Sequence, residues 1–279
     1  MELTWVDYRP GRVARVILNR PERLNAQSWA MIEDMDRAFN HAAADPACRV
    51  IVLSGAGRAF SSGHDFTSDE QLADVEARRD MDPFARGLFT RDIYVDSHLR
   101  WRDLPKPTIA MVHGHCFWGG WMLAAAMDIL FAAEDATFLT TRGDYFTTAW
   151  DVGPRKAKEI LFGNRVITAD EAMRWGYVNR IFPAAKLEAE TLRYAGHVAE
   201  QDPVDNRLTK FLINQAEDGM GYTTAVREAG AAFITRRYEA PGPRPAAARP
   251  AERPSPRHNF ARDRIAQAMA YFAQDRDRD

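Results

Sequence analysis

The sequence contains only two cysteines among its 279 residues, Cys48 and Cys116. Two cysteines cannot form a disulfide framework, and their wide separation excludes the CxxC pair of a metal-binding knuckle. We therefore expect buried free thiols of a reducing compartment. A long hydrophobic run is also missing. The longest apolar stretch, residues 116–127, contains two glycines and ends at Asp128, so it is too short for a membrane span.

An excess of charge of one sign is absent as well. The 37 Lys and Arg residues nearly balance the 39 Asp and Glu residues, and the formal net charge is -2. This balance, together with the lack of a lysine-rich stripe, argues against nucleic acid as a partner. The amino-terminal residues show neither the apolar core nor the small-residue cleavage site of a secretory signal. We therefore expect a cytoplasmic protein with no membrane partner.

The composition is that of an ordinary globular protein, with 46% hydrophobic and 27% charged residues, and the length allows one large domain or two ordinary ones. Residues 13–18 form a β-branched run that predicts a strand. Residues 28–44 carry apolar side chains at helical spacing and stop at Asp45-Pro46. The nearly continuous apolar run at 49–54 predicts a buried strand. Two strands joined by a helix indicate a βαβ-like unit.

The same patterns extend along the chain and divide it into regions. Further helices are predicted at 94–104, 121–127, 155–162, 169–175, 187–200 and 204–216, and further strands at 108–112, 129–132 and 178–182. Residues 67–92 are charged and predict a helical insert. We expect an α/β core over residues 1–200, a helical region over 201–239, a proline-rich arm over 240–257 and a terminal amphipathic helix over 258–279.

The terminal helix carries one apolar stripe, formed by Phe260, Ile265, Met269 and Phe272. The proline-rich arm before it has almost nothing to bury. Two placements follow for the helix: the arm carries it onto a neighbouring subunit, or it docks on its own domain.

Two junctions between a strand and a loop could hold a ligand. Gly63-His64-Asp65 follows the predicted strand at 49–54, and Gly119-Gly120 follows the strand at 108–112 and opens a helix. Glycine permits close approach of a ligand to the backbone, and the first N–H groups of a helix have no intrahelical acceptor. Two N–H groups aimed at one point would stabilise an oxyanion. The alternative is that these glycines only make tight turns.

The order of four motifs resembles the crotonase superfamily, the enoyl-CoA hydratase/isomerase family, over about residues 5–235. The motifs are NRPERLNA at 19–26, LSGAGRAFSSGHD at 53–65, KPTIA at 106–110 with GHCFWGG at 114–120 and DI at 128–129, and ITADEA at 167–172 with WGYVN at 175–179. The resemblance implies an α/β fold of the ClpP/crotonase type, a spiral of ββα units with a helical C-terminal region. It also implies assembly as a trimer or a dimer of trimers.

The resemblance further implies that the backbone N–H groups of His64 and Gly119 hold the thioester oxygen of an acyl-CoA as it becomes an enolate. Coenzyme A would enter as part of the substrate, with no separate cofactor and no metal. The residues expected along its path are Arg23, Leu24, Ala26, Ser62, His64, Asp65, Phe66, Thr67 and Gly119. For the His64 side chain we expect packing or solvent exposure, with a role as a base as the alternative. Asp65 is expected to fix the loop, with catalysis as the alternative.

The sequence departs from the family where a hydratase carries two glutamates. Those positions are Met122 and, without gaps, Arg142. Neither residue activates water at neutral pH. Acid–base groups would then come from Asp151, Asp144 or Tyr145. Each has a structural alternative: a helix cap for Asp151, a turn for Asp144 and the core for Tyr145.

The expected function is therefore that of an enzyme which stabilises a thioester enolate without being a simple crotonyl-CoA hydratase. Isomerisation, C–C bond hydrolysis and decarboxylation all remain open, as does a non-catalytic role in acyl-CoA binding or scaffolding. His115 is expected to be packed, and Arg142 to be a solvated surface residue, with pairing to a substrate carboxylate as its alternative.

Overall fold

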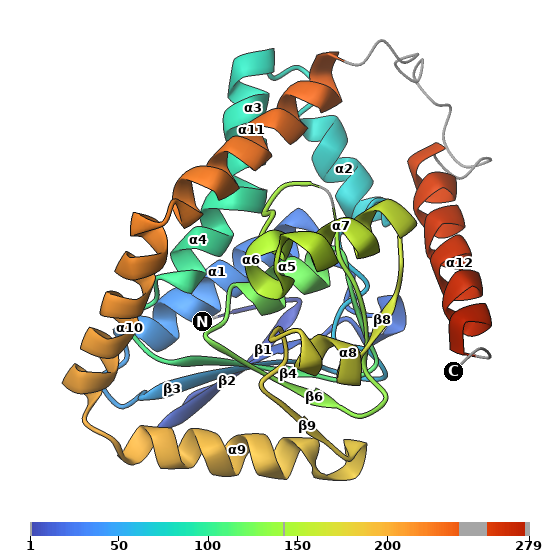
Figure 1. Cartoon of the computed structure of the whole chain (residues 1–279). Helices are drawn as coiled ribbons and strands as arrows, with labels where there is room; N and C mark the ends of the chain where they lie inside the picture. Colours follow the sequence, from blue (N-terminus) through green and yellow to red (C-terminus); the bar gives the residue numbers. More distant parts are fainter. Residues whose placement is uncertain (1, 142, 240–255, 277–279) are drawn as a thin grey trace.

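A six-stranded sheet runs through the centre of the chain (Figure 1). The computed structural model describes residues 2–141, 143–239 and 256–276. The strand order is β1-β2-β3-β4-β6-β9, and only the β1–β2 pair is antiparallel. The strands are β1 (Val6–Arg9), β2 (Val13–Leu18), β3 (Val50–Gly55), β4 (Thr108–Val112), β6 (Ile129–Ala133) and β9 (Arg180–Phe182). The prediction of an α/β fold is thus confirmed.

The predicted βαβ unit is present. Helix α1 (Trp29–Ala44) connects β2 to β3, which pair in parallel, and Ser28 caps the helix by accepting a hydrogen bond from the Met31 amide. Its apolar face is fully buried, as the helical spacing predicts. The unit places the loops after β2 and after β3 at the same edge of the sheet, because parallel strands end on the same side.

A second sheet of three short strands was not predicted. It consists of β5 (His115–Phe117), β7 (Thr137–Leu139) and β8 (Ile167–Thr168), in the order β5-β7-β8. Strands of two or three residues leave no readable period in a sequence. This sheet carries the chain directly into helix α5 (Gly119–Ala125), which begins two residues earlier than the prediction, at the first glycine of the Gly119-Gly120 pair.

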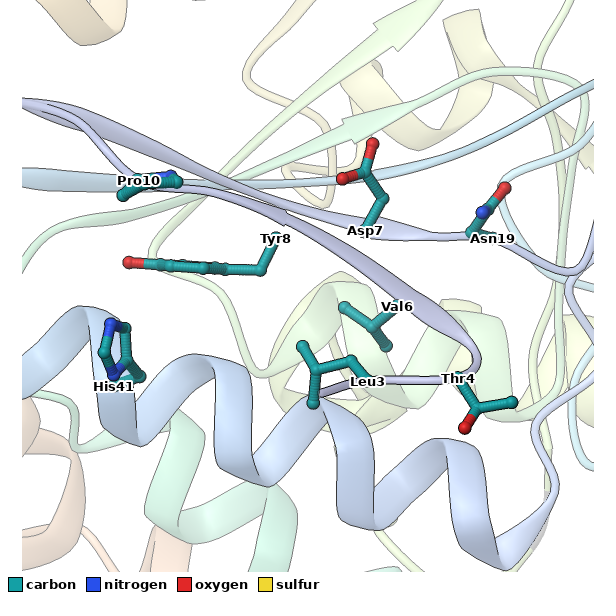
Figure 2. A pocket seen from close by; sticks show the side chains of 8 residues that line it. All are labelled: Leu3, Thr4, Val6, Asp7, Tyr8, Pro10, Asn19 and His41. Carbon is teal, nitrogen blue, oxygen red and sulfur yellow. The ribbon is translucent and has the colours of Figure 1, made fainter. Parts of the chain in front are cut away.

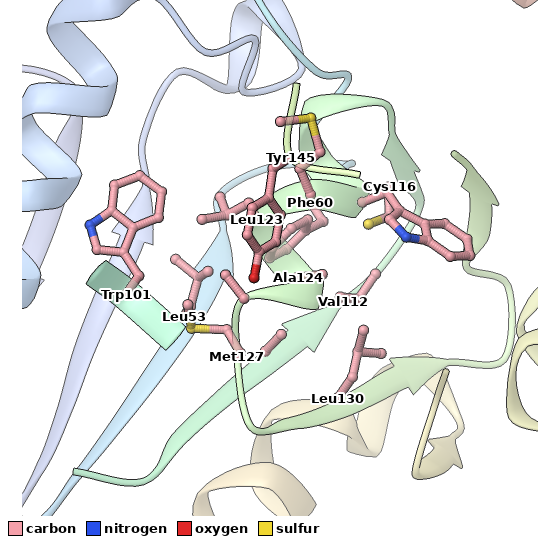
Figure 3. Packing of buried hydrophobic residues seen from close by; sticks show 14 of the residues in the cluster. Leu53, Phe60, Trp101, Val112, Cys116, Leu123, Ala124, Met127, Leu130 and Tyr145 are labelled. Atoms are coloured by element: carbon pink, nitrogen blue, oxygen red, sulfur yellow. The ribbon is translucent and has the colours of Figure 1, made fainter. Parts of the chain in front are cut away.

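Two hydrophobic layers cover the faces of the large sheet. Helix α9 (Ala184–Glu200) packs on one face, where Leu187, Ala195 and Ala199 meet strand residues such as Ile109 and Phe131. The other face holds the larger core, part of which is shown in Figure 3 around Leu123. Both cysteines are buried and free, as predicted.

The remaining elements surround this core. They are the 3-10 turn η1 (Pro21–Arg23), α2 (Asp69–Ala77), α3 (Pro83–Arg91), the π-turn η2 (Asp92–Asp96), α4 (Ser97–Arg102), α6 (Thr148–Val152), α7 (Pro154–Gly163), α8 (Ala169–Arg174), α10 (Pro203–Gly219), α11 (Tyr222–Glu239) and α12 (Pro256–Arg276). The single helix expected at 94–104 is therefore a π-turn followed by α4. In the part of the chain that is described, no helix is both long enough and apolar enough to cross a membrane.

The terminal helix α12 docks on its own chain. Ile265, Met269 and Phe272 pack with Ala268 against Phe117, Leu139 and Val166, and Asn164 exchanges hydrogen bonds with Arg264. Of the two predicted placements, docking on the same domain is the one the structure has. The side chain of Phe260 and residues 240–255, which include most of the predicted arm, lie outside the described residues.

Candidate active site

The opening motif and the first glycine-rich segment pair directly through their backbones. The amide of Gln27 donates to the Gly63 carbonyl at 2.8 Å, and the amide of Asp65 donates to the Gln27 carbonyl at 2.8 Å. Leu24 has a positive φ of 52°, and its carbonyl accepts from the Ser62 amide at 2.9 Å. Two of the segments that the resemblance assigned to the CoA path are thus brought together. They also contain Arg23, Ala26, His64, Phe66 and Thr67.

A side chain that was not singled out from the sequence holds this pairing in place. Asn25 is fully buried; its Oδ1 accepts from the Arg20 amide, and its Nδ2 donates to the carbonyls of Ala56 and Ala59. Three hydrogen bonds satisfy the buried amide and fix the course of the loop.

The second glycine segment lies against the first. Ser61 pairs with Cys116 in a parallel bridge: the Ser61 amide donates to the His115 carbonyl and the Phe117 amide donates to the Ser61 carbonyl, each at 3.0 Å. A Cβ built on Gly63 would lie 3.2 Å from the amide nitrogen of Gly119. Gly119 is the first residue of α5, so its N–H has no acceptor within the helix. The segment that carries His64 therefore lies directly beside the amino-terminal end of α5 at Gly119.

The imidazole of His64 packs directly over Gly119. A Cβ on Gly119 would lie 2.8 Å from Cε1 and 2.9 Å from Nδ1 of His64. The side chain is only 7% exposed, so the expected alternative of a solvent-facing ring is wrong. Its ring centroid lies 4.4 Å from that of Tyr94, and its Nε2 lies 4.0 Å from Oδ2 of Asp144.

Asp65 has the contacts of a loop-fixing carboxylate. Its Oδ2 accepts from Arg20 at 2.6 Å, with both side chains at most 3% exposed, and its Oδ1 accepts from the amides of Thr67 and Ser68. Burial alone would raise the pKa of Asp65, but hydrogen bonds from Ser68, Thr67 and Arg20 hold it below its ordinary value. Asp65 is therefore a fixed anion that faces Arg20.

Asp151 lies within α6 and is not a helix cap. Its Oδ2 accepts from the indole Nε1–H of Trp121 at 2.9 Å and from the Thr147 hydroxyl at 2.6 Å, and Gly153 takes the cap position before α7. Burial raises the pKa of Asp151 to about 6, although both hydrogen bonds lower it. The carboxylate therefore has the perturbed pKa expected of an acid–base group. Its contact with α5 is at Trp121, two residues after Gly119, and not at Gly119 itself.

Asp144 and Tyr145 sit side by side in the segment after β7, but they face different groups. Asp144 is buried at a positive φ of 42°, which fits the turn alternative, and its carboxylate faces His64. Tyr145 is 1% exposed, bonds to the Tyr222 hydroxyl at 2.8 Å and stacks on His98. Burial raises the pKa of the Tyr145 phenol, so it is a neutral core residue. Of the three predicted acid–base candidates, Asp144 is the one beside His64.

The resemblance placed the two hydratase glutamate positions at Met122 and Arg142. Met122 is 1% exposed in α5, and Arg142 lies outside the described residues. His115 bonds to the Thr137 hydroxyl at 2.9 Å and stacks on Phe117, so its predicted packing is what the structure has. Burial lowers the pKa of His115.

Gln27 was not predicted as a site residue. It is 1% exposed, its Nε2 donates to the Ser61 hydroxyl at 3.0 Å, and its Oε1 lies 2.9 Å from the point where a Cβ of Gly119 would be. The Ser61 hydroxyl donates to the Asn25 carbonyl, so Ser61 can only accept from Gln27, and the amide oxygen faces Gly119. Its place beside Ala26 in the opening motif is the one signal that could have indicated it.

A surface hollow of about 550 Å³ lies elsewhere, between β1 and α1, and is lined by residues such as Tyr8 and His41 (Figure 2). None of the predicted site residues lines it. Within the described residues there is no group of three or more His, Cys, Asp or Glu side chains that could hold a metal ion.

Comparison with known proteins places this arrangement in a family. The model of the enoyl-CoA hydratase/isomerase family matches residues 9–230. The chain is 36% identical over 236 residues to a putative enoyl-CoA hydratase, EchA13, of Mycobacterium tuberculosis, covering 77% of this chain and 74% of the relative. It is 32% identical over 221 residues to the human mitochondrial Delta(3,5)-Delta(2,4)-dienoyl-CoA isomerase, covering 74% of this chain and 66% of the relative.

The fold agrees with this assignment. The crystal structure of a probable enoyl-CoA hydratase from Mycobacterium thermoresistibile superposes with a TM-score of 0.76 at 37% identity, over 83% of this chain and 94% of that one. The fold is therefore of the crotonase type. The chain belongs to the enoyl-CoA hydratase/isomerase family.

The raised pKa of Asp151 predicts a pH-dependent contribution to stability. Between about pH 4 and 6 the folded state binds a proton that the unfolded chain releases, so stability decreases as the pH rises through this window. Asp151→Asn keeps an acceptor for Trp121 and Thr147 and removes the titration. We expect the variant to gain on the order of 2–3 kcal/mol over the native protein at pH 7 and little at pH 4.

Denaturant unfolding at both pH values measures this difference, with Asp80→Asn on the surface as the matched control. If the native protein and Asp151→Asn show the same pH dependence, the carboxyl group is not held away from water.

Proposed function

We propose that the protein binds an acyl-CoA thioester and stabilises its enolate with the backbone N–H groups of His64 and Gly119. The observation that carries this proposal is the approach of the Gly63-His64 segment to Gly119. Two backbone donors at one point can hold the thioester oxygen as negative charge develops on it. Each such donor lowers the activation free energy by about 3–4 kcal/mol. The hydratase and isomerase names of the relatives support an acyl-CoA as substrate.

The coenzyme A portion would follow the paired opening loop. Arg23, Leu24 and Ala26 on one side and Ser62, Phe66 and Thr67 on the other belong to the two segments that pair through Gln27 and Gly63. Arg23 is exposed there and can meet a phosphate group, whereas Leu24 and Phe66 are half-buried and offer apolar contact. Asp65 would keep this path in shape through Arg20 rather than touch the substrate.

We infer that the reaction is not simple hydration. Met122 is buried at one glutamate position and cannot move a proton. An enolate can still lead to isomerisation, C–C bond hydrolysis or decarboxylation, which need the oxyanion donors and fewer water-activating carboxylates. Asp144 is the carboxylate that geometry favours as part of the proton-transfer machinery, because it faces His64. The buried Met122 also favours a second candidate, a non-catalytic acyl-CoA-binding member of the family.

The first test is ligand binding by calorimetry with butyryl-CoA and free CoA. Gly119→Ala should weaken butyryl-CoA binding at least about tenfold, because its methyl group displaces the His64 ring and the Gln27 carbonyl, and a shift of about 1 Å in a positioned group has effects of this size. Gly196→Ala, a helical glycine with open space around it, is the matched control and should bind normally. Absence of binding by the native protein at millimolar ligand refutes the proposal.

The second test is crotonyl-CoA hydration, followed by loss of the enoyl absorbance. We expect a rate lower than that of a two-glutamate hydratase by about 10²-fold or more, because each absent acid–base group costs about 10²- to 10⁴-fold. Fast hydration would show that another carboxylate performs the glutamate role.

We also propose that the protein assembles as a trimer or a dimer of trimers. Helix α10 has no buried residue in the single chain, and it exposes Val204, Leu208, Phe211, Leu212 and Ile213, each at least 52%. Exposed apolar side chains grouped on one helix mark an interaction surface.

Light scattering checks the assembly. We expect a mass of three or six times the 31.6 kDa chain, and Phe211→Glu should reduce it because a charge in an apolar interface costs several kcal/mol. Phe162→Glu, which replaces an exposed phenylalanine on α7, is the control. A monomeric native protein would contradict the assignment.

A further inference from the structure

We propose that Trp118 is the positioning residue for the Gly119 N–H and that helix α12 holds Trp118 in place. The inference rests on the proposed function and deepens it, because it assigns the orientation of one donor to one side chain and one distant helix. In this assignment neither Trp118 nor α12 contacts the substrate, and both act through the backbone at Gly119.

The first argument is the backbone conformation of Trp118. Its φ of 49° and ψ of -106° are close to the first central position of a type II′ turn, about 60° and -120°, which glycine dominates. Leu24 and Asn164 also have a positive φ, but their ψ values of 37° and 47° place them in the ordinary left-handed region. A bulky side chain in the Trp118 conformation is strained, and such strain persists only where the surrounding structure enforces it.

The second argument is the effect of this conformation on the next peptide. The Trp118 carbonyl accepts from the Met122 amide at 3.1 Å, which is the first hydrogen bond of α5. In a planar trans peptide the N–H points away from the C=O. The Gly119 N–H belongs to the same peptide, so it points out of the amino-terminal end of α5. The ψ angle of Trp118 therefore sets the direction of this N–H.

The third argument is the set of contacts around Trp118. Its amide donates to the Leu139 carbonyl at 2.6 Å. Its Cβ lies 3.1 Å from the point where a Cβ of Gly63 would be. Its half-buried side chain packs against a cluster of buried side chains, namely Phe117, Leu139, Val166 and Ala268. Trp118 thus lies between the segment that carries His64 and this cluster.

Helix α12 supplies one side of the cluster. Figure 1 shows α12, in red, at the edge of the molecule beside β8. Ala268 is only 1% exposed there, and Met269 packs on the same cluster. Asn164 and Arg264 attach the helix through two hydrogen bonds of 3.0 Å. The support of a strained residue therefore comes from the last helix of the chain, and displacement of α12 would let Trp118 relax and turn the Gly119 N–H.

The experiment compares two ligands by calorimetry, butyryl-CoA and its thioether S-butyl-CoA, which has a CH₂ group in place of the thioester carbonyl. The ratio of their Kd values separates the contact with the thioester oxygen from the binding of coenzyme A and the alkyl chain. We expect the native protein to bind butyryl-CoA about fivefold or more tightly than the thioether, because two N–H groups donate to its oxygen.

Two substitutions of Trp118 separate strain from packing. Trp118→Ala keeps the Cβ, and with it the strain, but loses the side chain that packs on the cluster. Trp118→Gly loses the side chain and the strain together, because glycine adopts this conformation freely. We expect Trp118→Ala to bring the Kd ratio to about one and Trp118→Gly to recover at least about half of the native ratio, with thioether binding within about threefold of native in both.

Ala268→Glu tests the helix. A glutamate at this buried position displaces α12, so the Kd ratio should fall as in Trp118→Ala, and Met269→Glu is a second variant with the same expected result. Ala270→Glu places the same side chain at an exposed position of α12 and should leave the ratio unchanged. In the Trp118→Gly background Ala268→Glu should lower the ratio no further, because no strained side chain remains to be held.

The outcomes are distinct. If the native protein binds neither ligand, the proposed function is wrong. If it binds both ligands equally, or if Trp118→Ala keeps the native ratio or Trp118→Gly loses it as fully as Trp118→Ala, the inference is wrong while acyl-CoA binding stands. A native ratio in both Ala268→Glu and Met269→Glu overturns the role of α12. Equal weakening of both ligands in the Trp118 and α12 variants would show a general structural role and also overturn the inference.

Discussion

The site depends on the very close approach of two backbone segments, residues 55–63 and 114–120. A Cβ on Gly120 would lie 2.7 Å from the Ser61 carbonyl oxygen, and one on Gly63 would lie 3.0 Å from the Phe117 carbonyl oxygen. A Cβ on Gly114, at a φ of 56°, would overlap the Arg58 carbonyl. Real Cβ atoms are rarely found at such distances, so only glycine fits. Without this approach, Gly119 could not meet His64.

The opening loop is the second component that the site requires. A buried ion pair such as Arg20 with Asp65 adds little net stability, because desolvation offsets most of the attraction, but removal of one partner is costly. The Arg20–Asp65 pair matters here because it fixes the position of three segments of the chain. Arg20 also donates to the Ala26 carbonyl and stacks over Trp5, so the chain before the site, the loop and the segment after His64 are tied to one guanidinium group. The position of the His64 backbone follows from this connection.

Much of the fold could be predicted from the sequence, because long elements carry a clear period. Strand β4 and helix α1 lie where their apolar patterns place them. The small sheet of β5, β7 and β8 could not be predicted, since its strands are too short to show alternation. The start of α5 was missed because its Gly119-Gly120 pair looks like a loop.

The candidate site could also be predicted only in part, because local motifs are visible in the sequence and long-range side-chain contacts are not. The motifs indicated the two backbone segments that lie side by side at His64 and Gly119. The motifs could not indicate that the His64 ring turns inward to Asp144, because that contact joins residues far apart in the sequence. Likewise, the position of Asp151 shortly before the helix predicted at 155–162 suggested a helix cap, whereas its carboxylate accepts a hydrogen bond from Trp121 on another helix. Side-chain contacts of this kind are decided by tertiary packing, which no local pattern contains.

The most direct test of the account is a crystal structure of the protein with butyryl-CoA bound. The account predicts that the thioester oxygen lies within hydrogen-bonding distance of both the His64 and the Gly119 amide nitrogens, about 2.7–3.1 Å from each. A thioester placed elsewhere, or one whose oxygen meets only side chains, would contradict the central claim.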